Sequence, residues 1–377
     1  MDYQCYATCP DELTGLLAEE ITTLGGTDVR TAYRVVYFKA PPETAYKVNL
    51  HSRLASRVFR VLKIIPAHSP TIIFDKAKKI RFDEVFSAGQ PVSISVVASS
   101  EEKSIPTHLI GSKLREAIND CFLHHQDILP NQSSWDPVIG ISGYFHQKKL
   151  MVSVDMSGES LHRRGFRVEG HPAPLKETLA AALLAFCRYD GSVPFYDPMC
   201  GSGTLAVEAA MIAINRAPLI QRKKGSFGFE HFRDFDPQLW RTVVDQAREA
   251  EHPAKAGLFA SDIEAQFVGI AQKSLAKARL ETLVRLERKD FFETEKPAES
   301  GLLVANIPYG FRMDGKEGNA DFWRALGDHL KYHFKGWNCG ILAPASAPLK
   351  ELRLKPRKQA SFRNGTLPVR FVLCEMY

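Results

Sequence analysis

The sequence predicts an α/β protein whose C-terminal half forms a doubly wound, mostly parallel sheet and whose N-terminal half forms a smaller α+β region. From about residue 175 onward, strand-like and helix-like segments alternate, which favours parallel strands with helices on both faces of the sheet. Within that half, one apolar strand leads through an acid and a Gly-x-Gly turn directly into a helix. Before it, strands that alternate apolar and polar residues accompany amphipathic helices, as half-buried strands do.

The elements of the C-terminal half follow from these patterns. Strands are predicted at 193–196, 257–261, 284–287, 301–305 and 338–343. Helices are predicted at 174–188, 204–214, 263–280 and 320–334. Two further strand-like runs flank Asn364-Gly365, which indicates an antiparallel hairpin at the end of the chain.

The N-terminal half divides into two predicted parts. A helix from Asp11 to Leu24, ended by Gly25-Gly26, precedes a strand at 34–38 and a helix at 43–54. A strand at 91–97, a helix at 109–122 and two closing strands at 138–142 and 150–156 follow. We therefore expect an N-terminal α+β segment at 1–43, an α+β domain at 44–155, a linker at 156–174 and the parallel-sheet domain at 175–377.

Composition excludes several classes of protein. The 377 residues are 45% hydrophobic and 24% charged, which excludes wholesale disorder. There is no run of about 18 apolar residues and no secretory signal, so neither a membrane span nor export is expected. The 7 cysteines are scattered without a Cys-x-x-Cys pair, so we expect no disulfide scaffold, no zinc ribbon and no metal site, and a cytoplasmic location.

The glycine turn and the acids that follow neighbouring strands carry the first indication of chemistry. The stretch Asp197-Pro198-Met199-Cys200-Gly201-Ser202-Gly203-Thr204 lacks the lysine of a phosphate-binding loop. No acid follows about 20 residues later, as a dinucleotide site requires. Instead Asp262 and Asp290 end later strands, and Phe291 follows the second. One carboxylate per strand end suits a cationic nucleoside such as S-adenosylmethionine, although Asp262 can equally cap the helix that begins at Ile263.

A second motif, Asn306-Ile307-Pro308-Tyr309, ends the fourth predicted strand. The Asn306 amide oxygen and the Ile307 carbonyl can accept hydrogen bonds from an exocyclic amine, and Tyr309 can stack on the base. The motif is compatible with guanine N2 and with adenine N6.

Taken together, these stretches resemble amino-group methyltransferases. Three further stretches, Leu161 to Arg167, Ala173 to Ala181 and Asn215 to Pro218, are similar to the THUMP-domain 23S ribosomal RNA guanine-N2 methyltransferases. Members of that family are also described as N6-adenine-specific DNA methylases. The resemblance covers nearly the whole chain and implies a class I methyltransferase domain preceded by a ferredoxin-like and THUMP region.

The resemblance implies a cofactor, a substrate and roles for individual residues. S-adenosylmethionine would be bound by Thr178, Asp197, Pro198, Gly201, Gly203, Asp262, Ile263, Asp290 and Phe291. The target base would be held by Asn306, Ile307, Pro308 and Tyr309. The family usually has proline where this chain has Ile307, so we expect activity to persist and Ile307→Pro to leave it unchanged or higher.

The net charge of +6 is concentrated in three basic clusters that are candidates for contact with ribosomal RNA. They are Arg222-Lys223-Lys224 with Phe227 and Phe229; His162, Arg163, Arg164 and Arg167; and Lys350, Arg353, Lys355, Arg357, Lys358 and Arg363. No membrane and no obligate protein partner is expected.

The leading hypothesis is a large-subunit ribosomal RNA guanine-N2 methyltransferase. The alternatives are an adenine-N6 methyltransferase on DNA or RNA, and an RNA-binding assembly factor without turnover. Residues 160–377 are expected to bind the cofactor alone.

Overall fold

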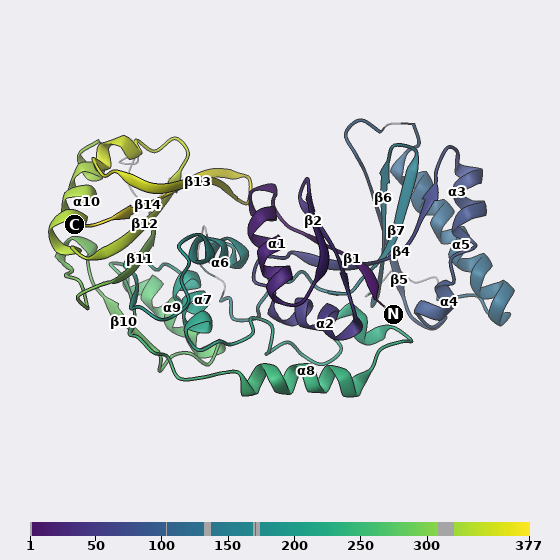
Figure 1. The fold of residues 1–377 in the computed structure, drawn as a ribbon, viewed down its shortest axis with the longest axis horizontal. Coiled ribbons are helices and arrows are strands. Elements are labelled where there is room, and N and C mark those ends of the chain that lie inside the picture. The colour runs from purple at the N-terminus through teal and green to yellow at the C-terminus, as the bar shows by residue number, and fades with distance from the viewer. Residues whose placement is uncertain (1, 103, 132–136, 169, 171–173, 308–319) are drawn as a thin grey trace. The chain divides into compact units, whose positions relative to one another are not determined.

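The computed structural model describes residues 2–102, 104–131, 137–168, 170, 174–307 and 320–377. The chain divides into two compact units (Figure 1). Unit 1 comprises Met1–Cys9, Leu17–Leu161 and Arg222–Asp245, and unit 2 comprises Pro10–Leu16, His162–Gln221 and Gln246–Tyr377. Residues 222–245 thus interrupt the expected 175–377 domain, because they belong to unit 1.

The sheet of unit 2 has the predicted doubly wound arrangement. Its strand order is β10-β9-β8-β11-β12-β14-β13. The strands from β10 to β12 pair in parallel, whereas β14 pairs antiparallel with both β12 and β13. The bounds are β8 Phe195–Asp197, β9 Leu258–Asp262, β10 Val284–Arg288, β11 Gly301–Asn306, β12 Trp337–Pro344, β13 Pro356–Asn364 and β14 Leu367–Glu375. The predicted strands and the hairpin at Asn364-Gly365 are therefore confirmed.

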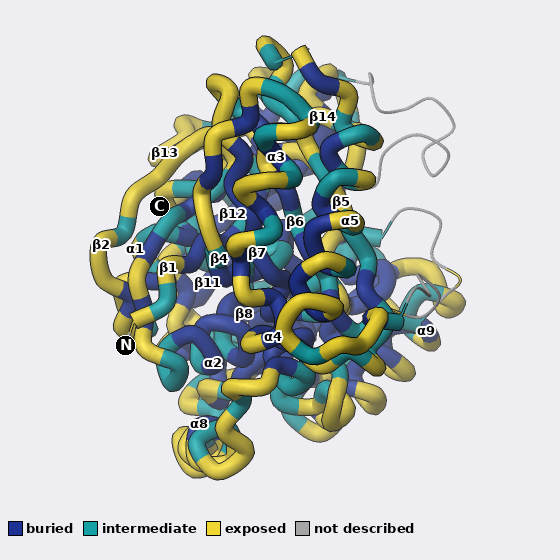
Figure 2. The backbone as a smooth tube through the Cα atoms, turned by 90° about the vertical axis from the view of Figure 1, so that its right-hand side faces the viewer, coloured by how far each residue is buried: buried dark blue, intermediate teal, exposed yellow. Residues whose placement is uncertain are grey.

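The helices of unit 2 bury the middle of this sheet. They are α6 Glu177–Phe186, α7 Thr204–Ala213, α9 Ala265–Lys277 and α10 Ala320–His333. Strands β8 and β11 are buried along almost their whole length (Figure 2), as expected for parallel strands covered on both faces. Trp323 and Leu330 of α10, and Phe334 directly after it, belong to the core. A helix that was not predicted, α8 (Pro237–Glu249), lies in the insertion between α7 and β9, and its residues up to Asp245 belong to unit 1.

Unit 1 also contains one seven-stranded sheet, in the order β2-β3-β1-β4-β7-β6-β5. Only β5 and β6 pair in parallel. The bounds are β1 Tyr3–Thr8, β2 Thr27–Ala32, β3 Val35–Ala40, β4 Arg57–Pro66, β5 Val92–Ala98, β6 Ile139–His146 and β7 Lys149–Asp155. Strands β1, β2 and β4 are not among the predicted elements. In β4 the basic residues Arg57, Arg60 and Lys63 recur every third position, which hides the two-residue period of a strand.

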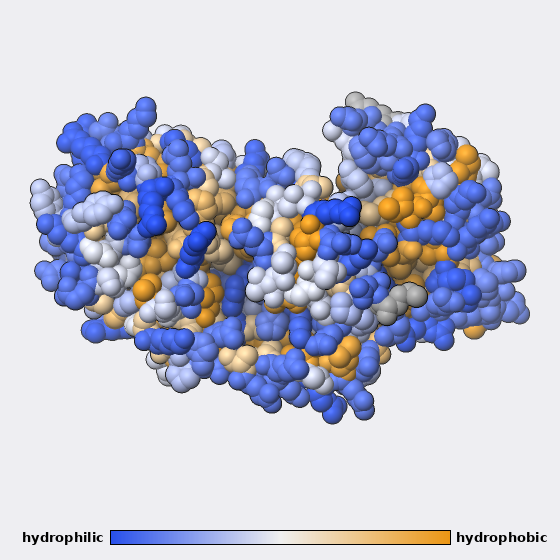
Figure 3. All heavy atoms as spheres, viewed as in Figure 1, coloured by the Kyte–Doolittle hydropathy of each residue, from blue (hydrophilic) through white to orange (hydrophobic). Residues whose placement is uncertain are grey.

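Helices cover one face of this sheet, and the other face carries exposed apolar side chains. The helices of the first half are α1 Thr14–Thr23, α2 Pro42–His51, α3 Pro70–Ala77, α4 Phe82–Val85 and α5 Thr107–Gln126. Pairing places Val97, Tyr144, Met151 and Ile64 in one row across β5, β6, β7 and β4. Val97, Tyr144 and Ile64 are exposed, and hydrophobic atoms gather over these strands in Figure 3.

The segment 222–245 supplies aromatic core to unit 1. The Phe229 ring stacks on Tyr46 with 4.4 Å between centroids, and Trp240 meets both rings edge-on. Phe227 and Phe229 are buried. The Arg222 guanidinium donates to backbone carbonyls, those of Ser157, Glu159 and Ser160. The prediction that Arg222, Phe227 and Phe229 contact RNA is therefore wrong, because these groups are used inside unit 1.

Among the described residues, no helix combines the length and apolar composition that crossing a membrane requires.

We predict that the fragment 162–377 does not behave as a clean domain. It would retain Phe227, Phe229 and Trp240 but lose Tyr46 and the rest of unit 1, and so expose a contiguous apolar surface. The fragment should bind a hydrophobic dye and self-associate in size-exclusion chromatography. The same fragment with these three aromatics changed to serine should be monomeric. A monomeric, dye-negative unmodified fragment would contradict the assignment of this segment to unit 1.

Candidate active site

The glycine turn between β8 and α7 closes tightly because two of its residues adopt positive φ. Gly201 has φ +53° and Gly203 has φ +77°, a region that side chains disfavour. A Cβ atom on Gly203 would lie 3.1 Å from the Ala271 side chain on α9. The Gly203 amide donates to the Cys200 carbonyl at 2.8 Å. The turn therefore needs glycine both for its conformation and for its approach to α9.

The Asp262 carboxylate fastens this turn to the neighbouring strand. Its Oδ2 accepts from the Gly201 amide at 2.9 Å, and its Oδ1 accepts from the Glu264 amide at 3.0 Å. The N-cap residue of α9 is Glu264 rather than Asp262. The alternative that Asp262 caps the helix is therefore wrong: one of its oxygens binds the Glu264 amide ahead of the helix, and the other holds the glycine turn.

Asp197 is the most unusual group of the site. Its side chain is 1% exposed. Neither carboxylate oxygen meets the full geometry of a hydrogen bond to a described residue, although the backbone amides of Met199 and Ala206 lie close enough to favour its ionised form. Burial, together with the nearby negative charge of Asp262, raises the pKa of Asp197 well above its usual range. A buried acid whose ionised form is so weakly compensated is costly, so the site is suited to a cationic ligand that would stabilise that form.

A pocket opens beside this turn and brings together residues from β8, the turn, α7 and β11. Of the predicted site residues, Asp197, Gly201 and Asn306 line it. Its other lining residues are Leu175, Met199, Cys200, Ser202, Thr204 and Leu205. The prediction had not included these six, although five of them lie in or directly after the glycine-turn motif and Leu175 lies in a family-like stretch.

Other predicted cofactor residues lie outside the wall of this pocket. Thr178 is buried on α6, Pro198 accepts from the Ser261 hydroxyl at 3.4 Å, and Ile263 is exposed. Asp290 accepts from the Phe292 amide at 3.0 Å and caps a short 3-10 helix. Phe291 packs in the core against Phe334 and His329. Pro308 and Tyr309 lie outside the described residues.

Asn306 ends β11 at the pocket, and Ile307 follows it into the core. The Asn306 Oδ1 is buried without a partner among the described residues. The Ile307 amide donates to the Leu342 carbonyl at 3.0 Å, and its side chain is 1% exposed. Proline would lack that amide hydrogen and the buried side chain. The expectation that Ile307→Pro leaves activity unchanged or higher therefore lacks structural support.

Two arginines predicted to bind RNA are used inside unit 2. Arg164 and Glu208 form an ion pair at 3.2 Å in which both side chains are fully buried. Arg167 donates to the Glu177 carboxylate at 2.9 Å and to the Leu175 carbonyl at 2.8 Å. Arg167 thereby holds the residue that forms one wall of the pocket. The prediction of phosphate contact is wrong for Arg164. Arg167 is half-buried and Arg163 is exposed, so for these two it stays a prediction.

The sheet order, the glycine turn and the strand-end acids define unit 2 as a class I methyltransferase domain. Residues 164–372 match the family described as RMKL-like, methyltransferase domain, and the chain belongs to that family. Residues 4–59 match the RlmL ferredoxin-like domain. That match extends beyond residue 43, where we had expected a boundary.

Relatives support the same assignment. The chain is 36% identical to ribosomal RNA large subunit methyltransferase K/L of Vibrio campbellii, over 97% of this chain and 52% of that protein. It therefore spans about half the length of that relative. It is 32% identical to slr0064 of Synechocystis, named as a candidate RNA methyltransferase, over 99% of this chain and 96% of that one. Among solved structures, SMU.472, a candidate methyltransferase in complex with SAH, superposes with a TM-score of 0.90 at 26% identity, covering 100% of this chain and 98% of that chain.

We predict that Ile307→Pro destabilises the protein by about 2–4 kcal/mol, because it removes a ladder hydrogen bond and buried side-chain volume. Urea unfolding measures the free energy directly. Ile307→Val is the matched control, since it keeps the amide hydrogen and should cost only about 0.5–1.5 kcal/mol. Equal stability of the two variants would show that the Ile307 amide contributes nothing.

Asp197→Asn should stabilise the ligand-free protein at neutral pH. The folded state raises the pKa of Asp197, so it favours the protonated acid. The stability linked to that proton is present at acid pH and is lost as pH rises through the folded-state pKa. Asparagine keeps the shape without ionising, so its advantage should grow as the pH is raised from acid to mildly alkaline values and reach on the order of 1–3 kcal/mol.

Thermal unfolding across that pH range tests this prediction. Asp328→Asn, which changes an exposed acid of α10, serves as the control. A difference in Tm between wild type and Asp197→Asn that does not change with pH would contradict the proposed burial of an ionisable acid.

Proposed function

We propose that the chain is an S-adenosylmethionine-dependent RNA methyltransferase that modifies the exocyclic N2 of a guanine in large-subunit ribosomal RNA. The observation that carries this proposal is that one pocket holds the buried carboxylate of Asp197, whose pKa is raised, together with the Asn306 amide oxygen, which has no partner among the described residues. The first favours a cation, and the second favours an amine donor. Membership of the RMKL-like methyltransferase family supports the same reaction.

The residues present fit S-adenosylmethionine. This cofactor is cationic and would supply an electrophilic methyl group. Asp197 and Asp262 would provide the negative field that favours it, and the glycine turn lets its backbone approach closely. We propose that Ile263, Asp290 and Phe291, at the ends of β9 and β10, complete the cofactor site after local rearrangement. That SMU.472 was solved with SAH supports this choice of cofactor.

The chemical task of the chain is to position a weak nucleophile. The lone pair of an exocyclic amine is delocalised into the base. Hydrogen bonds from that amine to the Asn306 Oδ1 and the Ile307 carbonyl would strengthen as positive charge develops on nitrogen. The proton can leave to solvent after transfer. Burial raises the pKa of Cys200 well above its usual range, so its thiol stays protonated and is no nucleophile.

The substrate is proposed from the relatives and from the surface of unit 2. The Vibrio campbellii protein is named for methylation of large-subunit ribosomal RNA. Of the three predicted basic clusters, the C-terminal one is fully exposed: Lys350, Arg353, Lys355, Arg357, Lys358 and Arg363. We propose that it contacts RNA phosphates. A ribosomal substrate would place the protein in the cytoplasm.

Two alternatives make different predictions for one experiment. Calorimetry with S-adenosylmethionine, followed by methyl incorporation into unmodified ribosomal RNA and mass spectrometry of the product, separates them. N2-methylguanosine supports the proposal, and N6-methyladenosine would replace it with the adenine hypothesis. Cofactor and RNA binding without any methylated product would establish an assembly factor. The tight glycine turn and the buried acid beside it favour an active enzyme.

Asn306→Ala should slow methyl transfer by about 100-fold or more at saturating cofactor and RNA, because one preorganised acceptor is lost. Cofactor and RNA affinities should change little. Single-turnover kinetics measures the step. Asn338→Ala is the matched control, since Asn338 also carries a buried amide oxygen without a partner among the described residues but lies at the opposite end of neighbouring strand β12. Equal rates for the two variants would move the base-binding pocket elsewhere.

A further inference from the structure

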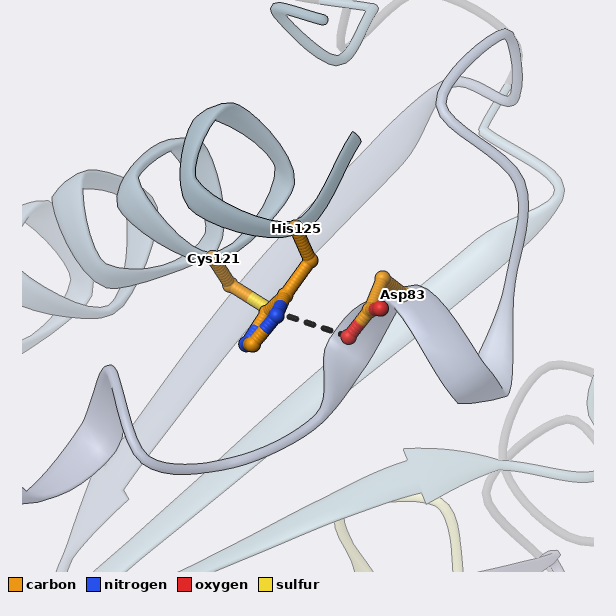
Figure 4. A group of neighbouring side chains, drawn as sticks. All are labelled: Asp83, Cys121 and His125. Carbon is orange, nitrogen blue, oxygen red and sulfur yellow. Dashed lines mark hydrogen bonds between the residues drawn. The ribbon is translucent and has the colours of Figure 1, made fainter. Parts of the chain in front are cut away.

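Three different potential metal ligands converge in unit 1, far from the residues of the candidate active site in sequence. They are Asp83 on α4 and Cys121 and His125 on α5 (Figure 4). One ligand atom from each lies within 4.8 Å of the others. Cys121 and His125 are one helical turn apart, so α5 presents both on the same face.

The carboxylate of Asp83 is held in place by its neighbours. The Arg81 Nε donates to Oδ1 at 2.9 Å, and the Arg81 Nη2 donates to Oδ2 at 2.8 Å. Arg233 donates to the Asp83 backbone carbonyl at 2.8 Å. Metal-binding carboxylates and imidazoles are commonly oriented by such outer hydrogen bonds. The Asp83 carboxylate is therefore preorganised before any ion arrives.

A single proton now links two of the three ligands. The Cys121 Sγ donates to the Asp83 Oδ1 at 3.2 Å, and both side chains are almost completely buried. His125 is exposed, so an ion could reach the cluster from solvent and keep water as a further ligand. This combination of buried thiol and carboxylate with an accessible imidazole is what a three-ligand, open tetrahedral site requires.

We propose that Asp83, Cys121 and His125 bind a divalent transition-metal ion of the zinc class. Mixed sulfur, nitrogen and oxygen donors suit Zn²⁺ better than the hard ions Mg²⁺ and Ca²⁺. On binding, a Cys121 Sγ–metal bond forms, the thiol proton passes to solvent and His125 binds as neutral imidazole. The thiolate and the Asp83 carboxylate supply two negative charges toward the ion, and the carboxylate shares its charge with the Arg81 guanidinium. The bound ion would tie the C-terminal end of α5 to α4.

The test uses the full-length chain, stripped with a chelator and then titrated with Co²⁺ and with Zn²⁺. We expect one Co²⁺ per chain, with the near-ultraviolet thiolate-to-cobalt absorption, and its displacement by Zn²⁺. Zinc should also raise the Tm of the stripped protein, because the ion binds the folded state preferentially. Arg81→Ala, which releases Asp83, should weaken zinc binding by about 10–100-fold.

Variants distinguish this site from other cysteines and histidines. His125→Ala changes an exposed residue and should abolish tight binding without affecting folding, and Cys121→Ser should abolish the charge-transfer band. His124→Ala and Cys187→Ser are the controls and should bind like wild type. Absence of the thiolate band in wild type, or unchanged affinity in His125→Ala, would overturn the proposal.

Discussion

The unit 2 site depends on two carboxylates buried side by side at the ends of adjacent parallel strands. Asp262 bonds to the glycine turn and to the chain just ahead of α9, so its charge is shared by backbone amides. Asp197 is buried beside it, and the backbone amides of Met199 and Ala206 offset its burial and the charge of Asp262 only in part. The fold thereby stores an unfavourable interaction that a cationic ligand would relieve. The folded protein loses stability at Asp197 when no ligand is bound, and we infer that this loss is the physical basis of selective binding of a cation.

Sequence was sufficient where local rules and function coincide. The alternation of strands and helices, the glycine turn and the Asn-Gly hairpin predicted the sheet of unit 2 almost completely. Sequence was insufficient where a contact between residues far apart in the chain determines the role of a side chain. The Ile307 amide bonds to β12 and Phe291 packs against His329 of α10, and neither contact has a local pattern. The cluster in unit 1 was equally hidden, since Asp83 lies 38 positions before Cys121.

The predictions of RNA contact from basic and aromatic residues were partly wrong for a related reason. Arg164, Arg167 and Arg222 each belong to a basic stretch that sequence alone cannot distinguish from an RNA-binding surface. In the structure they bind buried carboxylates and backbone carbonyls. Guanidinium groups serve both purposes, because the same fork of donors fits phosphate, carboxylate and carbonyl oxygens. Only the C-terminal cluster, on and before an edge strand, remains wholly exposed. Burial therefore decides which basic residues are available to RNA.

The central claim is that a cationic cofactor stabilises the ionised form of Asp197. Proton release on binding tests it most directly. S-adenosylmethionine is titrated calorimetrically at about pH 6 in buffers of different ionisation enthalpy, with wild type and with Asp197→Asn. The account predicts that wild type releases a measurable fraction of a proton per cofactor bound, since ligation lowers a raised pKa, and that the variant releases none from this position. Identical, buffer-independent heats for both proteins would contradict it.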